Sequence, residues 1–247
     1  MKEEISWGEY LHLRPGDLKK PEYRHVLLLL YWPIELAFFA LAGRLPWTYH
    51  PIYSALDDAI PFLESFVIPY TLWFLCVAFT VLFTLRYDVP NFRRFTWYMI
   101  ITILVSGSVF LFYPNYFPGR PVDALGWPGS VRDYYAAMPR KNLFTWALSF
   151  IYFTDPPRNA FPSEHVVVAL GMVFTVWNSK KLRRPSFALP FTALQLLICA
   201  SVTFTKQHSV LDVLGALPVT ILGYFTCYFP RRRAENAKPP ADESQAA

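Results

Sequence analysis

The stretch FVIPYTLWFLCVAFTVLFTL, residues 66–85, contains no charged residue. A helix needs about 20 mostly apolar residues to cross the roughly 30 Å of hydrocarbon in a bilayer. This stretch meets both requirements, so the sequence predicts a transmembrane helix here.

Five further segments meet these requirements or nearly do, and the fourth span along the chain is short. Two of them are uncharged, and the others contain only isolated ionisable side chains. Glu35 lies in the first segment, Glu164 and His165 open the fourth, and Asp212 lies in the sixth. The five segments are residues 26–43, 95–113, 161–177, 187–204 and 208–229. Together with residues 66–85 they predict an all-α integral membrane protein built as a bundle of six transmembrane helices.

The rest of the chain divides around this bundle. The apolar segment Leu143–Thr154 is too short to cross a bilayer, and its length suits an interfacial or re-entrant helix. We therefore expect a cytoplasmic N-terminal segment (residues 1–24), one membrane domain (residues 25–230) and a disordered cytoplasmic tail (residues 231–247).

The composition excludes several other classes of protein. Hydrophobic residues make up 54% of the chain and charged residues 17%, against about 25% charged in an average soluble domain. A disordered chain would be far less apolar. Cys76, Cys199 and Cys227 follow neither disulfide nor zinc spacing, which excludes a disulfide-stabilised secreted module.

The basic residues predict the orientation of the bundle. In a six-helix topology, 16 of the 23 Lys and Arg residues fall on the side that holds both termini. The positive-inside rule then places both termini in the cytoplasm. The net charge of +5 reflects this bias toward anionic headgroups, so we expect membrane lipids and no nucleic acid as partners. The sequence shows no secretory signal peptide, and the short loops fit a bacterial plasma membrane.

Three polar clusters interrupt the apolar background. They are residues 113–121, residues 155–165 and residues 201–212. Each cluster follows an odd-numbered predicted span, so we expect all three on the extracytoplasmic side, close enough to form one site.

His208 and Asp212 lie four residues apart, which places them on one face of a helix. An ionised Asp212 can accept the ring N–H of His208, fix its tautomer and stabilise positive charge while the other nitrogen attacks or accepts a proton. The alternative is a structural pair that only pins the end of the helix.

Ser163 and His165 stand at the start of the fourth span, after Pro162. Exposed N–H groups at a helix N-terminus favour an anion, and His165 could protonate a departing oxygen. The alternative is that Ser163 serves only as a helix cap.

Arg120 and Lys206 are the cations best placed to hold a phosphate on this side. Each could instead be an interfacial residue whose charge reaches toward water, and Arg158 has the same two interpretations. Glu35 has no evident partner and is interpreted as structural. No cluster of acidic, His or Cys residues suggests a metal, and no cofactor is expected.

At these residues the chain resembles the type 2 phosphatidic acid phosphatase superfamily, which includes the vanadium haloperoxidases. The family pattern is Lys-x6-Arg-Pro, then Pro-Ser-Gly-His, then Ser-Arg-x5-His-x3-Asp. The matching residues, in order, are Arg120-Pro121, Pro162-Ser163 with His165, and Ser201 with His208 and Asp212. The resemblance covers about residues 113–215. It implies six spans, His208 as the nucleophile that forms a phosphohistidine, Asp212 as its partner and His165 as the acid. It also implies that Arg120 and Ser163 hold the phosphate.

The departures from that pattern are informative. Tyr113 replaces the family lysine, Glu164 the glycine and Val202 the arginine, which leaves Lys206 as a candidate substitute cation. Glu164 is compatible with an anion site only if its carboxylate points away. The form seen here is similar to the branch that contains inositol phosphorylceramide synthases.

These features predict a metal-independent membrane phosphatase that acts on a lipid phosphate or diphosphate through a phosphohistidine. The first alternative is a lipid phosphotransferase of the inositol phosphorylceramide synthase type, in which an alcohol replaces water. The second is a non-catalytic lipid carrier or scaffold, which the missing cations would motivate.

Overall fold

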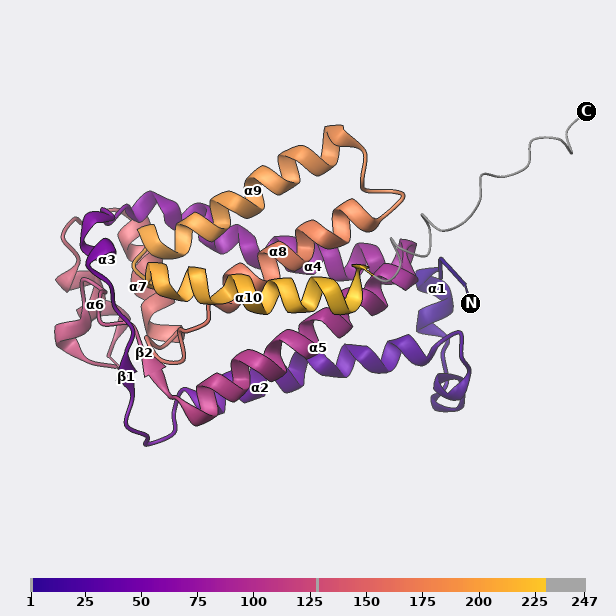
Figure 1. The fold of residues 1–247 in the computed structure, drawn as a ribbon, viewed down its shortest axis with the longest axis horizontal. Coiled ribbons are helices and arrows are strands. Elements are labelled where there is room, and N and C mark those ends of the chain that lie inside the picture. Colours follow the sequence, from indigo (N-terminus) through magenta and orange to yellow (C-terminus); the bar gives the residue numbers. More distant parts are fainter. Residues whose placement is uncertain (1, 128, 230–247) are drawn as a thin grey trace, which may run out of the picture.

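The computed structural model describes residues 2–127 and 129–229 as a bundle of long helices with short elements gathered at one end (Figure 1). The tail predicted for residues 231–247 lies outside the described residues.

The helices of the bundle run along its long axis (Figure 1). They are α2 (Tyr31–Ala42), α4 (Val67–Tyr87), α5 (Val89–Phe112), α8 (Glu164–Asn178), α9 (Pro185–Phe204) and α10 (Val210–Cys227). A 3₁₀ helix, Arg24–Leu30, leads directly into α2. α8 packs against α5, α9 and α10, which places it at the centre of the bundle.

The predicted all-α membrane architecture is confirmed, with a qualification about the number of spans. Five segments in the described ranges are long and apolar enough to cross a bilayer: Arg24–Ala42, Glu64–Tyr87, Val89–Phe112, Pro185–Phe204 and Val210–Cys227. α8 has 15 residues. A helix of that length rises about 22 Å, which is shorter than the hydrocarbon core.

α5 starts at Val89, earlier than the apolar pattern predicted, because its start depends on capping. The side chain of Asp88 accepts the backbone N–H of Asn91, and a proline lies in the first turn. Both features are typical of helix N-termini. The helix therefore includes Arg93 and Arg94, which hydropathy alone had assigned to a loop.

Short elements gather at the end of the bundle opposite the N-terminus (Figure 1). Strands β1 (His50–Pro51) and β2 (Asn115–Tyr116) form one parallel pair there. The helices at this end are α3 (Ala55–Ala59), α6 (Val131–Ala137) and α7 (Leu143–Thr154), with 3₁₀ turns at Glu64–Phe66 and Asp123–Leu125. α7 has the bounds that the sequence predicted for a short helix. α1 (Trp7–Leu11) and the 3₁₀ helix Pro15–Lys19 lie at the opposite end.

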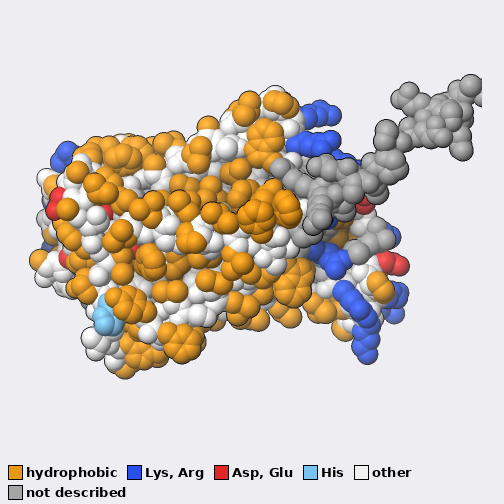
Figure 2. Space-filling view, viewed as in Figure 1, with side chains coloured by type: hydrophobic (Ala, Val, Ile, Leu, Met, Phe, Trp, Pro, Cys, Tyr) orange, Lys and Arg blue, Asp and Glu red, His pale blue; other side chains and the backbone are white. Residues whose placement is uncertain are grey.

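The charged and apolar surfaces separate along the same axis. Figure 2 shows hydrophobic side chains over the visible flank of the bundle and Lys and Arg gathered near the end that holds the N-terminus. This distribution is what a membrane-embedded bundle with one strongly basic end presents.

Tyr98 joins three bundle helices in the core. Its side chain is fully buried, and its hydroxyl donates to the carbonyl of Val167 at 2.8 Å. Gly171 of α8 and Gly223 of α10 face its ring, since a Cβ at these positions would lie 2.3 Å and 2.5 Å from ring atoms. Small residues commonly permit such close packing between membrane helices.

We expect Gly171→Ala to destabilise the protein, because the added methyl group collides with the Tyr98 ring. Overpacking of this kind costs about 1–3 kcal/mol. The thermal midpoint in detergent should fall by several degrees, whereas Gly16→Ala should leave it unchanged because nothing lies within 4 Å of a Cβ there. Equal midpoints for the two variants would contradict this account of the core.

Candidate active site

Asn115 joins the first polar cluster to the second. Its side chain is fully buried, accepts the backbone N–H of Phe161 at 2.8 Å and donates to the Phe161 carbonyl at 3.1 Å. Its own carbonyl accepts the N–H of Asn159 at 2.6 Å. These bonds fix the chain immediately before α8.

The second cluster is joined in turn to the third. The backbone N–H of Ser163 donates to the carbonyl of Asp212 at 3.1 Å, and the His208 ring bonds to the carbonyl of Ala160 at 3.0 Å. The three clusters predicted to share one side of the membrane thus meet at one end of the bundle.

The geometry of His208 fixes which ring nitrogen bears the proton. Its Nδ1 lies 3.0 Å from the Ala160 carbonyl and 3.1 Å from Asp212 Oδ2. A carbonyl oxygen can only accept, so Nδ1 is the donor. In the neutral ring, Nε2 then carries the lone pair, which is the requirement for a nucleophile or a base.

His165 lies beside His208 in an aromatic environment. Its ring centroid is 4.6 Å from Tyr70, 4.6 Å from Trp73 and 5.8 Å from His208. The two aromatic rings restrict its rotation. Its Nε2 is buried and has no hydrogen-bond partner among the described residues, so this nitrogen is available to a ligand.

Several other buried polar groups in this region also lack partners. Among the described residues they include Ser163 Oγ, Arg120 Nε, the side-chain amide of Asn159 and Gln207 Oε1, together with the acceptors Asp212 Oδ1 and both carboxylate oxygens of Glu164. Ser163 occupies the N-cap position of α8, as predicted, but its hydroxyl makes no capping bond. Buried polar groups are normally paired, so unpartnered groups contributed by all three clusters indicate a site for a polar ligand. An oxyanion at the N-terminus of α8 would satisfy the donors among them.

Arg120 is connected to the histidines through Asp155. Its Nη1 donates to the Asp155 carbonyl at 2.9 Å, and its guanidinium lies 4.8 Å from the centre of the Tyr152 ring. Asp155 Oδ2 accepts from the Tyr70 hydroxyl at 3.1 Å and from Gln207 Nε2 at 3.4 Å. Because Tyr70 contacts His165, this network links the cation to the proposed acid.

Lys206 occupies a different place from the one predicted for it. Its ammonium donates to the carbonyls of Asp57 and Ile60, at the end of α3. Burial lowers its pKa, and the carboxylates of Asp57 and Asp58 offset part of that effect. In this structure Lys206 therefore holds α3 and is not turned toward the histidines.

The three departures from the family pattern have distinct surroundings. The Tyr113 ring stacks on His50 with centroids 4.4 Å apart, and Val202 is fully buried among hydrophobic side chains. Glu164 faces Ser106 of α5, and its carboxylate oxygens are buried. In the described ranges, no group of three or more His, Cys, Asp or Glu side chains could hold a metal ion.

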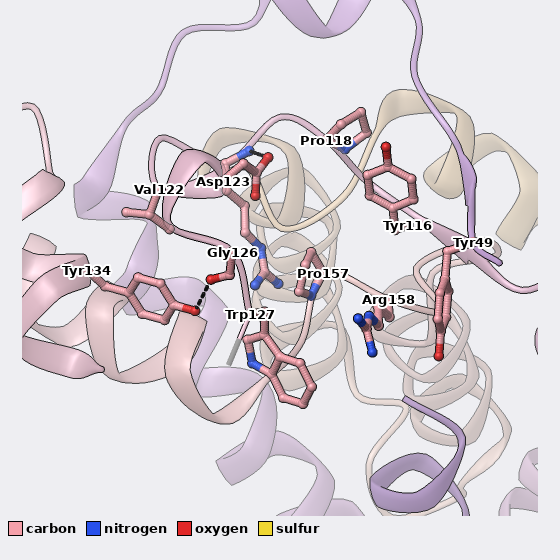
Figure 3. A pocket seen from close by; sticks show the side chains of 11 residues that line it. Tyr49, Tyr116, Pro118, Val122, Asp123, Gly126, Trp127, Tyr134, Pro157 and Arg158 are labelled. Carbon is pink, nitrogen blue, oxygen red and sulfur yellow. Dashed lines mark hydrogen bonds between the residues drawn. The ribbon is translucent and has the colours of Figure 1, made fainter. Parts of the chain in front are cut away.

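Arg120 is one of the residues that line a cavity of about 410 Å³, which Figure 3 shows from close by. Its walls include Tyr49, Trp127, Asp123 and Arg158. The Arg158 guanidinium lies 4.6 Å from the Tyr49 ring centre and 5.6 Å from that of Trp127, and its Nη1 donates to the carbonyl of residue 43 at 3.2 Å. Burial raises the pKa of Asp123, an effect that Arg120 partly offsets. The cavity thus combines aromatic faces with two guanidinium groups.

Four residues of this region were not predicted as site residues: Tyr70, Asp155, Asn159 and Gln207. Asp155, Asn159 and Gln207 lie within the polar clusters, and Gln207 directly precedes His208, so their positions in the sequence could have indicated them. Tyr70 lies in an uncharged span, and only the fold brings it to Asp155.

Comparison with known protein families matches the PAP2 superfamily over residues 36–226, which is more than half of the chain. No curated protein and no solved structure matches the chain. The family match includes all three polar clusters and confirms the resemblance seen in their motifs at the level of the superfamily. The chain belongs to the PAP2 superfamily.

Proposed function

We propose that this protein is a metal-independent lipid phosphatase that acts at the extracytoplasmic face of a membrane, with His208 as the nucleophile. PAP2 superfamily members are generally phosphoesterases, which supports the reaction class. The observation that argues most strongly for His208 is that two acceptors face its Nδ1, which in the neutral ring leaves the lone pair on Nε2.

In the proposed first step, His208 Nε2 attacks the phosphorus of the lipid phosphate, and the bond between phosphorus and the lipid oxygen breaks. His165, as the imidazolium, gives its proton to the departing oxygen and becomes neutral. In the second step a water molecule attacks the phosphohistidine, gives a proton to His165 and releases phosphate as the N–P bond breaks. The cycle restores both histidines.

The charge that develops on the phosphoryl oxygens would be met by donors already in place. Arg120 Nε and Ser163 Oγ are buried donors without a partner among the described residues, and Ser163 stands at the N-terminus of α8. Preorganised donors of this kind supply much of the stabilisation of a charged transition state. Asp212, fully buried, would stabilise the positive ring of His208.

Replacing His208 with alanine should abolish phosphate release from lipid phosphates in detergent, with a loss of about 10³-fold or more. The matched control is His12→Ala, which removes an exposed histidine at the other end of the bundle and should leave the rate unchanged. His165→Ala should slow release of a lipid alcohol far more than release of p-nitrophenol, which departs without a proton. Retained activity in His208→Ala would refute the proposal.

The second candidate is a lipid phosphotransferase of the inositol phosphorylceramide synthase type, in which an alcohol takes the place of water. The cavity lined by Arg120 favours this candidate, because an attack by water needs no room for an organic acceptor beside the phosphate. The Tyr134 hydroxyl donates to the carbonyl of Gly126 (Figure 3). The indole N–H of Trp127 donates to the carbonyl of Phe153. With these polar atoms paired, the two aromatic rings line the cavity wall. Such a wall suits an organic acceptor.

If the cavity holds an acceptor, Trp127→Ala should lower the ratio of transfer product to free phosphate by about tenfold, as loss of a buried aromatic contact would. The measurement is product separation after supplying lipid donors with and without glycerol or inositol. Trp146→Ala is the control, because Trp146 is an exposed tryptophan on the short helix α7. Absence of any acceptor-dependent product from the wild type would leave hydrolysis as the reaction.

Phosphorus labelling of His208 during turnover would eliminate a non-catalytic carrier.

We also propose that both termini are cytoplasmic and that the host membrane is a bacterial plasma membrane. The basic end of the bundle in Figure 2 supports the orientation.

In a background without Cys76, Cys199 and Cys227, Arg132→Cys should react with a membrane-impermeant maleimide in intact cells. Lys180→Cys should react only after permeabilisation. The opposite pattern would invert the topology and place the histidines inside the cell.

A further inference from the structure

The short helix α3 contacts the segment that contains His208, although the two are about 150 positions apart in sequence. α3 opens with a capping box in which the backbone N–H of Ser54 donates to Asp57 Oδ2 at 2.8 Å. Asp57 is only 3% exposed, whereas its neighbour Asp58 is exposed. The buried carboxylate therefore faces the interior of the bundle end.

The Asp57 carboxylate holds the first turn of α10. Its Oδ1 accepts the backbone N–H of Val210 at 2.8 Å, and its Oδ2 accepts the hydroxyl of Ser209 at 2.6 Å. The first N–H groups of a helix have no partner inside the helix, and a negative charge there is favourable. The Asp57 side chain, which belongs to α3, thus caps α10. That helix carries Asp212, the hydrogen-bond partner of His208.

Ser209 connects this cap to His208. Its backbone N–H donates to Asp212 Oδ2 at 3.0 Å, and that same oxygen lies 3.1 Å from His208 Nδ1. Asp57 makes no hydrogen bond to His208 itself among the described residues, so its influence passes through Ser209 and the first turn of α10.

Lys206 attaches α3 to the other side of His208. Its ammonium donates to the carbonyls of Asp57 and Ile60, while its backbone adopts a left-handed conformation with φ of 54°. Non-glycine residues rarely adopt this conformation, and the anchored side chain helps to hold it. The residues on both sides of His208 are therefore fixed to one short helix.

We propose that Asp57 is a positioning residue for His208, a role that rests on the proposed function of His208 as the nucleophile. Asp57 holds the N-terminal turn of α10 so that Asp212 Oδ2 stays in line with His208 Nδ1 and His208 Nε2 stays aimed at phosphorus. A carboxylate is required because three donors, from Ser54, Ser209 and Val210, converge on its two oxygens. An amide offers one acceptor oxygen and turns an NH₂ group toward at least one of these donors.

The main test compares Asp57→Asn with Asp58→Asn in the full chain, in detergent, with phosphatidate as the substrate. A displaced nucleophile slows the chemical step, so kcat of Asp57→Asn should fall on the order of 10- to 100-fold. KM should change less than twofold, because Arg120 and Ser163 are untouched. Asp58→Asn should match the wild type in both parameters, and Asp57→Glu should recover part of the rate. A rise in KM with kcat unchanged would overturn the positioning role.

A second readout needs no turnover. In the full chain labelled with ¹⁵N-histidine, the Nδ1–H signal of His208 is the one that disappears in His208→Ala. Asp57→Asn should shift or broaden this signal, and Asp58→Asn should not. If the wild type releases no phosphate from any lipid while the signal still responds to Asp57→Asn, the proposed function fails and the control of the His208 ring by Asp57 stands. An unchanged signal together with an unchanged kcat would overturn the inference.

Ser209→Ala provides the variant to use if Asp57→Asn does not fold. It breaks the hydroxyl link while leaving the bond between Asp57 and the Val210 N–H in place. The same loss of kcat and the same change in the His208 signal are expected. A Ser209→Ala protein with wild-type values in both measurements would refute the proposed path from Asp57 to His208.

Discussion

The Nδ1 proton of His208, shared between the Ala160 carbonyl and Asp212, ties the start of α10 to the segment before α8. Asp212 is fully buried, and an unpaired buried charge is strongly destabilising. The pair is therefore a structural requirement of this end of the bundle as well as the centre of the proposed chemistry. Once it forms, Ser163 and His165 are placed by the first turn of α8, and Asn115 fixes the chain that leads into that turn.

Two cations of the family pattern are absent from this chain, and under the proposed function other groups would take their place. Tyr113 stacks on a histidine and Val202 is a core residue, so neither position supplies charge. Arg120 remains and is braced by Tyr152 and the Asp155 carbonyl. The N-terminus of α8 adds oriented N–H groups, which favour an anion without a side-chain charge. Lys206, the candidate substitute in sequence, instead anchors α3.

Hydropathy located the helices well because a bilayer imposes a simple length requirement on each of them. The short helix α7 and the ends of α9 and α10 fall close to the predicted positions. Hydropathy placed the start of α5 wrongly, because a helix can begin at a capping residue that lies outside the apolar run. At α5, the Asp88 cap and a proline start the helix before the apolar run begins. Hydropathy also predicted α8 as a transmembrane span, like the longer helices. A helix of 15 residues is too short to cross a full hydrocarbon core.

The sequence by itself determined the membrane class, the grouping of three polar clusters on one side and the pairing of His208 with Asp212, because helix periodicity and hydrophobicity act locally. Only the tertiary structure decided which distant groups meet. Tyr70 reaches Asp155, Asp57 reaches Ser209 and Val210, and Arg158 lines a cavity beside Arg120. These contacts join segments that are far apart in the chain, and they depend on how the helices pack and how buried polar groups find partners, which no local pattern encodes.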